Sequence, residues 1–398
     1  MLLRSATLAD GRIVDIRIHL DTIDEVAASL AAEPAEQVVD LAGHLLLPAF
    51  VEPHAHLDKA FLSERFTNDA GDLMGAIIAM QQNRHLITYE DTVERAERAV
   101  RLMVRNGASA IRTHADTTTE SGLMSVEALT EVRRRTADIC DIQIVSLVSW
   151  PVTGAAGADS RALLREALQM GADLVGGCPH LDESPEGANE TLLEIASEYQ
   201  RGVDLHTDEN LDPNKNGLED LARRVLASGF AYGVTASHCV SLGSQTPRRQ
   251  DQIAELVAAA NISVVALPHT NLFLQGRQHQ QSMPRAITAV KALTSRNVNV
   301  CAGADNLQDP FNPMGRGDPL ETASLMVMLA HLLPDHGLEV VSANARQALG
   351  LTPVLIEAGN IADLVAIKVG SVREALAFGP PERTVLHRGV VVSPAHRY

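Results

Sequence analysis

Short apolar segments and amphipathic helical segments alternate along the chain from residue 48 to residue 350. The apolar segments are PAFVEPHAH, ASAIRTHAD, DIQIVSLVS, ADLVGGCPH, GVDLHTDE, GVTASHC, ISVVALPH and VNVCAGADN. Many helical segments end in Gly or Asn directly before the next apolar segment, which is the usual helix stop signal. Continuously apolar strands joined by helices indicate a parallel sheet that is buried on both faces. Eight such units over roughly 300 residues predict a (β/α)8 barrel.

The two ends of the chain have a different pattern. Residues 1–47 and 353–398 contain short strand-like segments such as RIVDIRIHL, ADLVAIKV and RTVLHRGVVVS. We expect these segments to form a small β-sandwich domain beside a barrel made by residues 48–352. An open doubly wound α/β sheet is the alternative fold, but the sequence lacks the glycine-rich phosphate turn that usually marks it.

Charge and cysteine content narrow the class of protein. A formal net charge of −17 disfavours nucleic acid and anionic membrane as partners, because both would repel the chain. No apolar segment has the length of a transmembrane helix, and the N-terminus lacks the apolar stretch of a signal peptide. The four cysteines are scattered among apolar neighbours, which indicates free thiols. We therefore expect a cytoplasmic protein.

Two histidines, His54 and His56, stand one residue apart in the first strand of the predicted barrel. Alternate side chains of a strand point to the same face, so both imidazoles could bind one metal ion. With 15 histidines in 398 residues, one such pair by chance is no surprise. The metal interpretation therefore depends on the residues around the pair.

Ionisable side chains recur where the predicted barrel strands end. They are Asp116, His180, His206, Asp208, Glu209, His238, His269 and Asp305. The carboxyl ends of barrel strands meet at one face, where the active sites of such barrels lie. A single residue of this kind is more often a cap or a hydrogen-bonded structural group, but the whole set favours a metal site. The histidines outside this pattern are expected at the surface: His279, His331, His336, His387 and His396.

Four residues would supply three nitrogen ligands and one oxygen ligand: His54, His56, His206 and Asp305. Zinc and iron accept such a set and keep an open position for water, which then loses a proton near neutral pH. His238 could act as a base beside this water, and Glu209 could carry a proton to the substrate.

A second metal ion would need a bridging ligand, often a carbamylated lysine on the fourth strand. The fourth strand, GADLVGGCPH, contains no lysine, so we expect one divalent ion, zinc or iron. The other zinc deaminase pattern, H-x-E followed by P-C-x-x-C, is also missing. Any deamination would therefore use the barrel site.

Nine segments, in order from about residue 40 to residue 368, resemble the amidohydrolase superfamily. They are LLLPAFVEPHAHLDKAF, IRTHAD, DIQIV, GADLVGGCPH, DLHTDE, TASHC, NLFLQGR, ADNLQDPFNPMG and EAGNIADLVAI. Within the superfamily they are most similar to the branch of cytosine deaminase and N-isopropylammelide amidohydrolase. The resemblance implies a distorted (β/α)8 TIM barrel with one iron or zinc ion and a β-sandwich from both termini. It also implies the metal ligands proposed above from the ends of the predicted strands. The roles that it implies for Glu209 and His238 are likewise those proposed above.

Two positions at which ring recognition is expected depart from the cytosine deaminase pattern. Ser149, followed by Trp150, replaces a glutamine after the third strand, and Asn306 replaces a second aspartate. A site that reads polar ring edges loses orders of magnitude when its partner groups are wrong, so cytosine itself is doubtful as a substrate. Phe311 stands in place of a tryptophan near the substrate. Trp150, Phe311 and Phe61 are candidates for stacking on a flat ring.

The segment after the histidine pair allows several interpretations. Lys59 could pair with Asp58, reach the pocket or form a surface salt bridge. Residues 62–92 are long for a barrel loop and could form a helical lid or an oligomer contact.

These observations favour a metal-dependent aminohydrolase acting on a small aminated N-heterocycle of the pyrimidine, triazine or pterin type. A metal-bound hydroxide would attack the ring carbon, Glu209 would protonate the ring nitrogen, and His238 and Asp305 would manage the proton of the water before ammonia leaves. The alternatives within the superfamily are ring-opening hydrolysis of a cyclic amide and N-dealkylating hydrolysis. A barrel that binds without turnover is the alternative outside enzymes. We expect a small-molecule substrate and a homo-oligomer.

Overall fold

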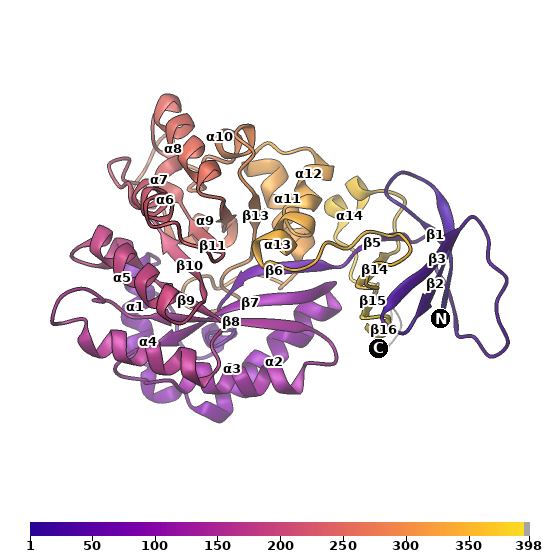
Figure 1. Cartoon of the computed structure of the whole chain (residues 1–398), viewed down its shortest axis with the longest axis horizontal. Coiled ribbons are helices and arrows are strands. Elements are labelled where there is room, and N and C mark those ends of the chain that lie inside the picture. The colour runs from indigo at the N-terminus through magenta and orange to yellow at the C-terminus, as the bar shows by residue number, and fades with distance from the viewer. Residues whose placement is uncertain (394–398) are drawn as a thin grey trace.

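The computed structural model describes residues 1–393, and one of its two sheets has eight parallel strands in sequence order (Figure 1). The strands are β6 (Phe50–Ala55), β7 (Ala108–Thr117), β8 (Asp141–Val148), β9 (Leu174–Gly177), β10 (Gly202–Thr207), β11 (Val234–His238), β12 (Ile262–Ala266) and β13 (Val300–Ala302). Every residue of β6 and β11 is buried, as expected for strands covered on both faces. The distorted (β/α)8 barrel expected from the sequence is confirmed.

Helices surround the barrel and connect successive strands (Figure 1). The longer ones are α2 (Tyr89–Arg105), α3 (Met124–Arg135), α4 (Ala158–Met170), α5 (Pro185–Glu198), α6 (Gly217–Ser228), α8 (Pro247–Ala259) and α11 (Pro319–Leu329). The shorter ones are α7 (Val240–Gly243), α9 (Pro268–Leu274), α10 (Val290–Ser295), α12 (Pro334–Glu339), α13 (Ala343–Ala348) and α14 (Val372–Phe378). Local signals set their ends. Ser184 caps α5 by accepting from Gly187 N, and Gly229 ends α6 with a φ of 63°.

The barrel closes between its first and last strands. A parallel bridge joins Ala55 to Asp305, where Asp305 N donates to His54 O at 3.0 Å and His56 N donates to Asp305 O at 3.1 Å. The carboxyl group of Glu52 accepts from His54 N and from the backbone of the segment that follows β13, at 3.1 Å each. Closure therefore places the histidine pair beside Asp305, although about 250 residues separate them in the chain.

Both ends of the chain build the second sheet, which is mixed and lies to the right in Figure 1. Its strand order is β16 (Val390–Ser393), β15 (Arg383–His387), β14 (Leu364–Ile367), β5 (Leu45–Pro48), β1 (Leu2–Thr7), β2 (Ile13–His19) and β3 (Thr22–Ala27), with β4 (Val38–Asp40) paired to β1. A separate hydrophobic cluster fills it. This arrangement agrees with the small β-sandwich expected from both termini.

A buried ion pair connects the domain of the second sheet to the barrel. Arg383 on β15 donates to both carboxylate oxygens of Asp318, the N-cap residue of α11, at 2.8 and 2.7 Å. Also on β15, His387 is only 2% exposed, and its Nδ1 lies 3.3 Å from Oδ1 of Asp363. The expectation that His387 lies at the surface is therefore wrong, because its strand runs through the interior of this sheet. His396 lies outside the described residues.

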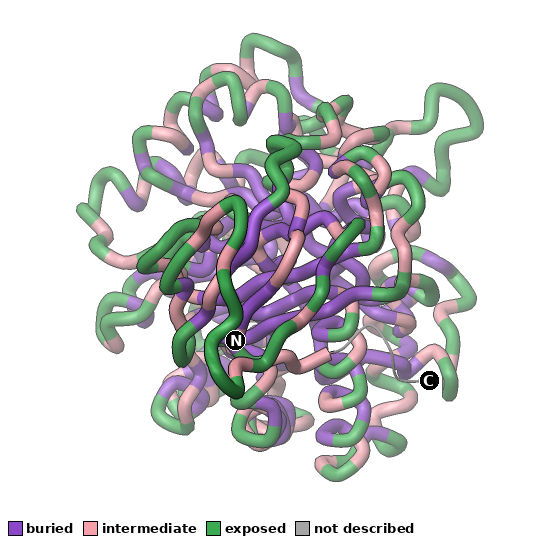
Figure 2. The backbone as a smooth tube through the Cα atoms, turned by 90° about the vertical axis from the view of Figure 1, so that its right-hand side faces the viewer, coloured by how far each residue is buried: buried purple, intermediate pink, exposed green. Residues whose placement is uncertain are grey.

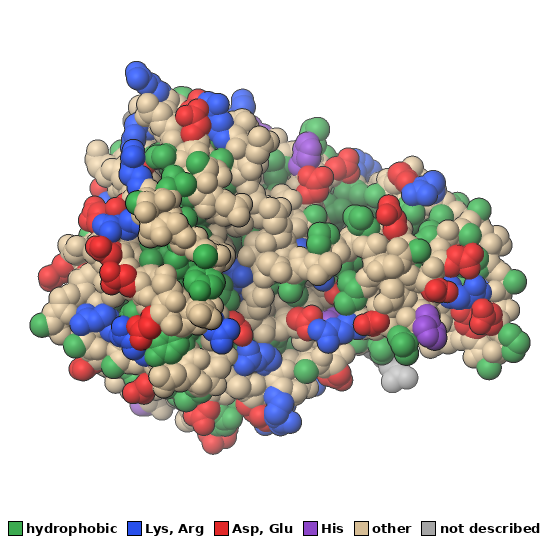
Figure 3. Space-filling view, in the orientation of Figure 1, with side chains coloured by type: hydrophobic (Ala, Val, Ile, Leu, Met, Phe, Trp, Pro, Cys, Tyr) green, Lys and Arg blue, Asp and Glu red, His purple; other side chains and the backbone are tan. Residues whose placement is uncertain are grey.

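Segment 62–92 forms the 3-10 turns η1 (Leu62–Glu64) and η2 (Arg84–Leu86) around helix α1 (Leu73–Gln82). A further turn, η3 (Pro179–Leu181), follows β9. Figure 2 shows buried backbone in the centre of the molecule and exposed backbone around it. On the face drawn in Figure 3, acidic and basic side chains are interspersed. Within residues 1–393, none of the helices combines the length and the apolar character needed to cross a bilayer. The four cysteines are free thiols.

Candidate metal centre and active site

The structure brings together the four residues predicted as ligands. One atom from each of His54, His56, His206 and Asp305 lies within 4.8 Å of the others, and all four side chains are buried. Oδ1 of Asp305 is 3.1 Å from Nε2 of His56 and 3.5 Å from Nε2 of His54. Nε2 of His206 is 3.2 Å from Nε2 of His56. Four side chains from β6, β10 and the end of β13 thus converge on one point.

These separations fit a metal ion. Zinc-to-nitrogen distances near 2.0–2.1 Å place two ligands of a tetrahedral ion about 3.3 Å apart. Within residues 1–393, Nε2 of His54 and both carboxylate oxygens of Asp305 are buried and have no hydrogen-bond partner. Buried polar atoms are normally paired. Burial, aided by neighbouring histidines, lowers the pKa of His54 and His206 well below the usual value and keeps both rings neutral, the form that binds metal.

A hydrogen-bonded chain behind His54 fixes its tautomer. Nδ1 of His54 lies 2.9 Å from Oγ of Ser237, and this hydroxyl donates to Oδ1 of Asp204 at 2.8 Å. Since the serine proton goes to Asp204, the oxygen of Ser237 accepts from Nδ1–H of His54. Nε2 is then left with a lone pair that points at the cluster. Arg112 completes the chain by donating to Asp204 at 3.0 Å.

Lys59 is buried beside the four clustered residues. Its ammonium lies 2.7 Å from Oδ1 of Asp116, 3.3 Å from Oδ1 of Asp58 and 3.2 Å from Nδ1 of His56. Burial alone would lower the pKa of Lys59, but the carboxylates of Asp116 and Asp58 raise it above its usual value. Lys59 is 4% exposed, so the surface salt bridge is ruled out and the pairing with Asp58 is present.

Glu209 and His238 stand together at the ends of β10 and β11. Oε1 of Glu209 is 3.6 Å from Nδ1 of His238, and Nε2 of His238 is 4.0 Å from Oδ2 of Asp305. Burial raises the pKa of Glu209 well above its usual value, and the charge of Asp305 adds to this effect. Burial lowers the pKa of His238. An acid that holds its proton beside a neutral imidazole is suited to proton transfer.

The backbone is unusual at two of these residues. His238 has a φ of 70° and Asp305 a φ of 65°, in the left-handed region that residues with a side chain seldom adopt. Such conformations persist only where the surroundings hold them, and they concentrate at functional sites.

The other predicted strand-end residues have structural contacts. Asp208 accepts a hydrogen bond from the first turn of α6 at 2.9 Å and acts as a cap. The ring of His269 lies 3.1 Å from a threonine hydroxyl of α11. Nδ1–H of His180 donates to the carbonyl oxygen of His206 at 3.0 Å. Asp208, His269 and His180 are thus not among the four clustered ligands.

Asn306 is buried next to Asp305 and is held from two sides. Its Nδ2 donates to Asp309 at 2.8 Å, and its Oδ1 accepts from Oγ1 of Thr270 at 3.1 Å. Its amide therefore has a fixed direction beside the cluster. Phe311 follows in the same loop and is half-buried.

The other candidates for ring recognition differ in accessibility. Ser149 is half-buried and Trp150 is 37% exposed. Phe61 is only 2% exposed, and the guanidinium of Arg98 lies 3.8 Å from the centre of its ring. Arg98, which belongs to the outer helix α2, covers one face of this ring, so that face is not available to a substrate.

Sequence reasoning missed His114, which lies directly behind His54. The two ring centroids are 4.0 Å apart, and both ring nitrogens of His114 lack a hydrogen-bond partner among residues 1–393. His54, His114 and Asp204 could also form a set of metal ligands, but Arg112 already binds Asp204 and its charge would repel a cation. The only sequence signal was spacing, since His114 precedes Asp116 by two residues and shares its face of β7.

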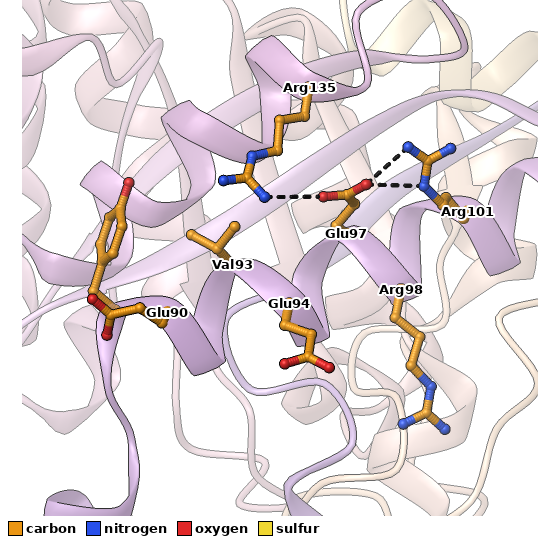
Figure 4. A pocket seen from close by; sticks show the side chains of 8 residues that line it. Glu90, Val93, Glu94, Glu97, Arg98, Arg101 and Arg135 are labelled. Atoms are coloured by element: carbon orange, nitrogen blue, oxygen red, sulfur yellow. Dashed lines mark hydrogen bonds and ion pairs between the residues drawn. The ribbon is translucent and has the colours of Figure 1, made fainter.

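A separate groove of about 440 Å³ lies on the outer helices α2 and α3. Figure 4 shows Glu97 between Arg101 and Arg135, with ion pairs of 2.8 and 3.4 Å. None of its lining residues belongs to the histidine cluster. Since these charges neutralise one another, the groove adds no reactive group to the site.

Comparisons with known proteins agree with the geometry. The profile of the Amidohydrolase family matches residues 71–393. A pterin deaminase of Rhizobium rhizogenes is 33% identical over 97% of this chain and 86% of its own. A 5-methylcytosine deaminase from Klebsiella pneumoniae, solved with phosphonocytosine, has a TM-score of 0.90 and 31% identity over 100% and 99% of the two chains. An N-isopropylammelide isopropylaminohydrolase from Burkholderia multivorans has a TM-score of 0.86 and 28% identity over 99% and 98%.

Proposed function

Because this chain belongs to the Amidohydrolase family, we propose that it is a hydrolase that removes an exocyclic amine from a small N-heterocycle and releases ammonia. The observation that carries the proposal is the convergence of a four-ligand cluster with the Glu209–His238 pair. Two of the similar proteins are deaminases of a pterin and of 5-methylcytosine.

We propose that one divalent ion, zinc or iron, is held by the four clustered ligands: His54, His56, His206 and Asp305. When bound, such an ion lowers the pKa of a water molecule so that it can act as a nucleophile near neutral pH. The chain's own contribution is to present three imidazoles and one carboxylate in a buried place. Ser237 and Asp204 hold His54 in the tautomer that leaves Nε2 free.

The proton transfers belong to Glu209, His238 and Asp305. Nε2 of His238 faces Asp305 and accepts a proton from the attacking water, with Asp305 sharing this proton. Glu209 holds its proton through burial and donates it to the ring nitrogen beside the carbon under attack. The Glu209 carboxylate then takes the proton of the new hydroxyl group on the tetrahedral carbon and passes it to the amine, so that the C–N bond breaks, a carbonyl forms and ammonia leaves as a neutral molecule. The proton that His238 accepted then restores the acid form of Glu209.

We propose a pterin-type ring as the first candidate substrate, with pyrimidine and triazine rings as the others. Ser149 is shorter than the glutamine that cytosine deaminases carry there, so a larger fused ring has room where cytosine would lose a contact. Asn306 supplies a neutral amide with a fixed direction. Trp150 and Phe311 are candidates for contact with the ring face.

A second candidate is release of an alkylamine from the same class of ring. It is supported by similarity to the N-isopropylammelide isopropylaminohydrolase. Ring opening of a cyclic amide remains the third. We further propose residues 48–352 as the catalytic barrel, residues 1–47 and 353–398 as the β-sandwich, and a cytoplasmic homo-oligomer as the working form.

The test is amine release by zinc- and iron-loaded protein across aminated pterins, pyrimidines, triazines and purines, with N-alkylated members included. Glu209→Gln serves as the control, since it keeps the shape but has no acidic proton to transfer and should lose about 10²- to 10⁴-fold in rate. Ammonia from one ring class that this control abolishes supports deamination. Alkylamine alone supports the second candidate. No amine from metal-loaded protein, with ring-opened product instead, contradicts both.

A further inference from the structure

Asn271 lies in the middle of α9, the short helix that follows β12, and is completely buried. Its Oδ1 is 3.1 Å from Nδ1 of His238. It contacts none of the four candidate metal ligands through a hydrogen bond among the described residues. Any effect of Asn271 on the reaction would therefore act through His238.

The two ring nitrogens of His238 face different partners. Nδ1 meets Oδ1 of Asn271, which only accepts hydrogen bonds, so Nδ1 carries the ring proton. Nε2 has no hydrogen-bond partner among residues 1–393 and faces Oδ2 of Asp305 at 4.0 Å. A neutral ring with its proton on Nδ1 has its lone pair on Nε2, on the side of the metal cluster.

A second donor meets the same oxygen of Asn271. Nε2 of Gln275, one helical turn further along, also points to Oδ1 of Asn271, at 3.4 Å. If the amide were reversed, its NH2 group would face Nδ1 of His238. Nδ1 would then lack the proton, Nε2 would carry it, and the ring could not accept a proton on the side of Asp305.

We infer that Asn271 is a positioning residue that holds His238 in the tautomer with an unprotonated Nε2 directed at the metal cluster. The inference deepens the proposed function, on which its kinetic consequence rests. It also explains how Glu209 stays available. Because Asn271 accepts the Nδ1–H bond at 3.1 Å, the carboxyl of Glu209 at 3.6 Å need not do so and can serve the substrate.

The direct test is ¹⁵N NMR of histidine-labelled protein, which distinguishes protonated from unprotonated ring nitrogens. The signals of His238 are assigned by their loss in His238→Gln. Wild-type protein, with and without zinc, should show a proton on Nδ1 and none on Nε2. Asn271→Asp should keep this pattern, because a carboxylate also accepts, whereas Asn271→Leu should give a mixture of tautomers. A proton on Nε2 in the wild type, or an unchanged ring in Asn271→Leu, overturns the inference.

Kinetics give a second readout on the substrate found to be active. Asn271→Leu should lower kcat by about 10²-fold with KM changed by less than about threefold, and Asn271→Asp should restore most of kcat. Zinc content should stay at the wild-type value in both variants. Asn189→Leu is the matched control, because Asn189 is an equally buried amide that bonds only to Gly217 and Asp220.

The NMR test and the kinetic test can fail independently of each other. The NMR result does not depend on any substrate, so it stands if the protein proves not to be a deaminase. If Asn271→Leu does not fold, Asn271→Ala takes its place with the same expected tautomer mixture. Equal losses of kcat in the Asp and Leu variants would overturn the positioning role, because the role requires only a hydrogen-bond acceptor.

Discussion

Oγ of Ser237 lies 2.9 Å from Nδ1 of His54, between the imidazole and the carboxylate of Asp204. Partners of this kind orient a metal-binding histidine and commonly contribute 10- to 100-fold to metal affinity. We predict that Ser237→Ala lowers zinc affinity by about that factor, measured by competition with a chromogenic chelator. Ser109→Ala, the same change at a buried serine of β7, should leave affinity unchanged. Equal affinities in both variants would contradict the prediction.

Glu52 has a pKa raised to about 8, chiefly because it is buried. Between its ordinary pKa of 4.5 and about 8, the native state holds a proton that the unfolded state releases. The free energy of unfolding of metal-free protein therefore contains a term that falls as pH rises, by up to about 1.4 kcal/mol per pH unit. Below 4.5 both states are protonated, so the term is constant there.

Glu52→Gln should remove this pH-dependent term, because the amide does not ionise. We predict that the free energy of unfolding of the variant rises relative to the wild type between about pH 5 and about pH 8. Urea unfolding of chelator-treated protein at intermediate pH values measures the difference. Parallel pH profiles for the two proteins would mean that Glu52 is ionised in the native state.

Thr270 is expected to act on substrate binding through Asn306. Its hydroxyl donates to Oδ1 of Asn306 at 3.1 Å and accepts from the backbone N of Asn306 at 3.4 Å. Thr270→Val keeps the shape but frees the amide, so we predict that KM rises about three- to tenfold while kcat changes less. Thr322→Val is the control, since Thr322 is also buried and its hydroxyl lies 3.1 Å from the ring of His269. A fall in kcat at constant KM would place Thr270 in the chemical step instead.

Much of the fold could be predicted because it depends on local patterns. The eight apolar segments correspond to β6–β13, and the strand-like ends form the second sheet. The spacing of His54 and His56 identified one face of one strand, and barrel geometry then indicated which distant residues would join them. The ligand set stays a prediction until metal binding is measured.

Some contacts could not be predicted from the sequence, because they depend on which side of a strand or helix faces inward. Phe61 looked like a surface for a flat ring, yet Arg98 of α2 covers one face of it. His387 was expected at the surface, but it is buried. Its strand, β15, is an inner strand of the sheet that both ends of the chain form. Asn271 begins the segment NLFLQGR, but its contact with His238 could not be predicted, because that ring lies 33 residues earlier in the chain.

Lys59 places a positive charge beside a site for a cation. Its ammonium lies 3.2 Å from Nδ1 of His56 and is compensated by Asp116 at 2.7 Å and Asp58 at 3.3 Å. Lys59→Met should therefore have two opposite effects. It leaves two carboxylates without their partner, which should lower the free energy of unfolding of metal-free protein by about 2–3 kcal/mol, since Asp116 is partly exposed.

The same change makes the surroundings of the cluster more negative. We predict that Lys59→Met binds zinc about tenfold or more tightly than the wild type, because a positive charge near the cation is gone and two negative charges remain. Urea unfolding without metal and chelator competition with metal measure the two effects separately. Lys291→Met, at an exposed lysine of α10, should change neither. Weaker zinc binding by Lys59→Met would mean that the lysine supports the cluster by orienting His56 rather than by opposing the cation.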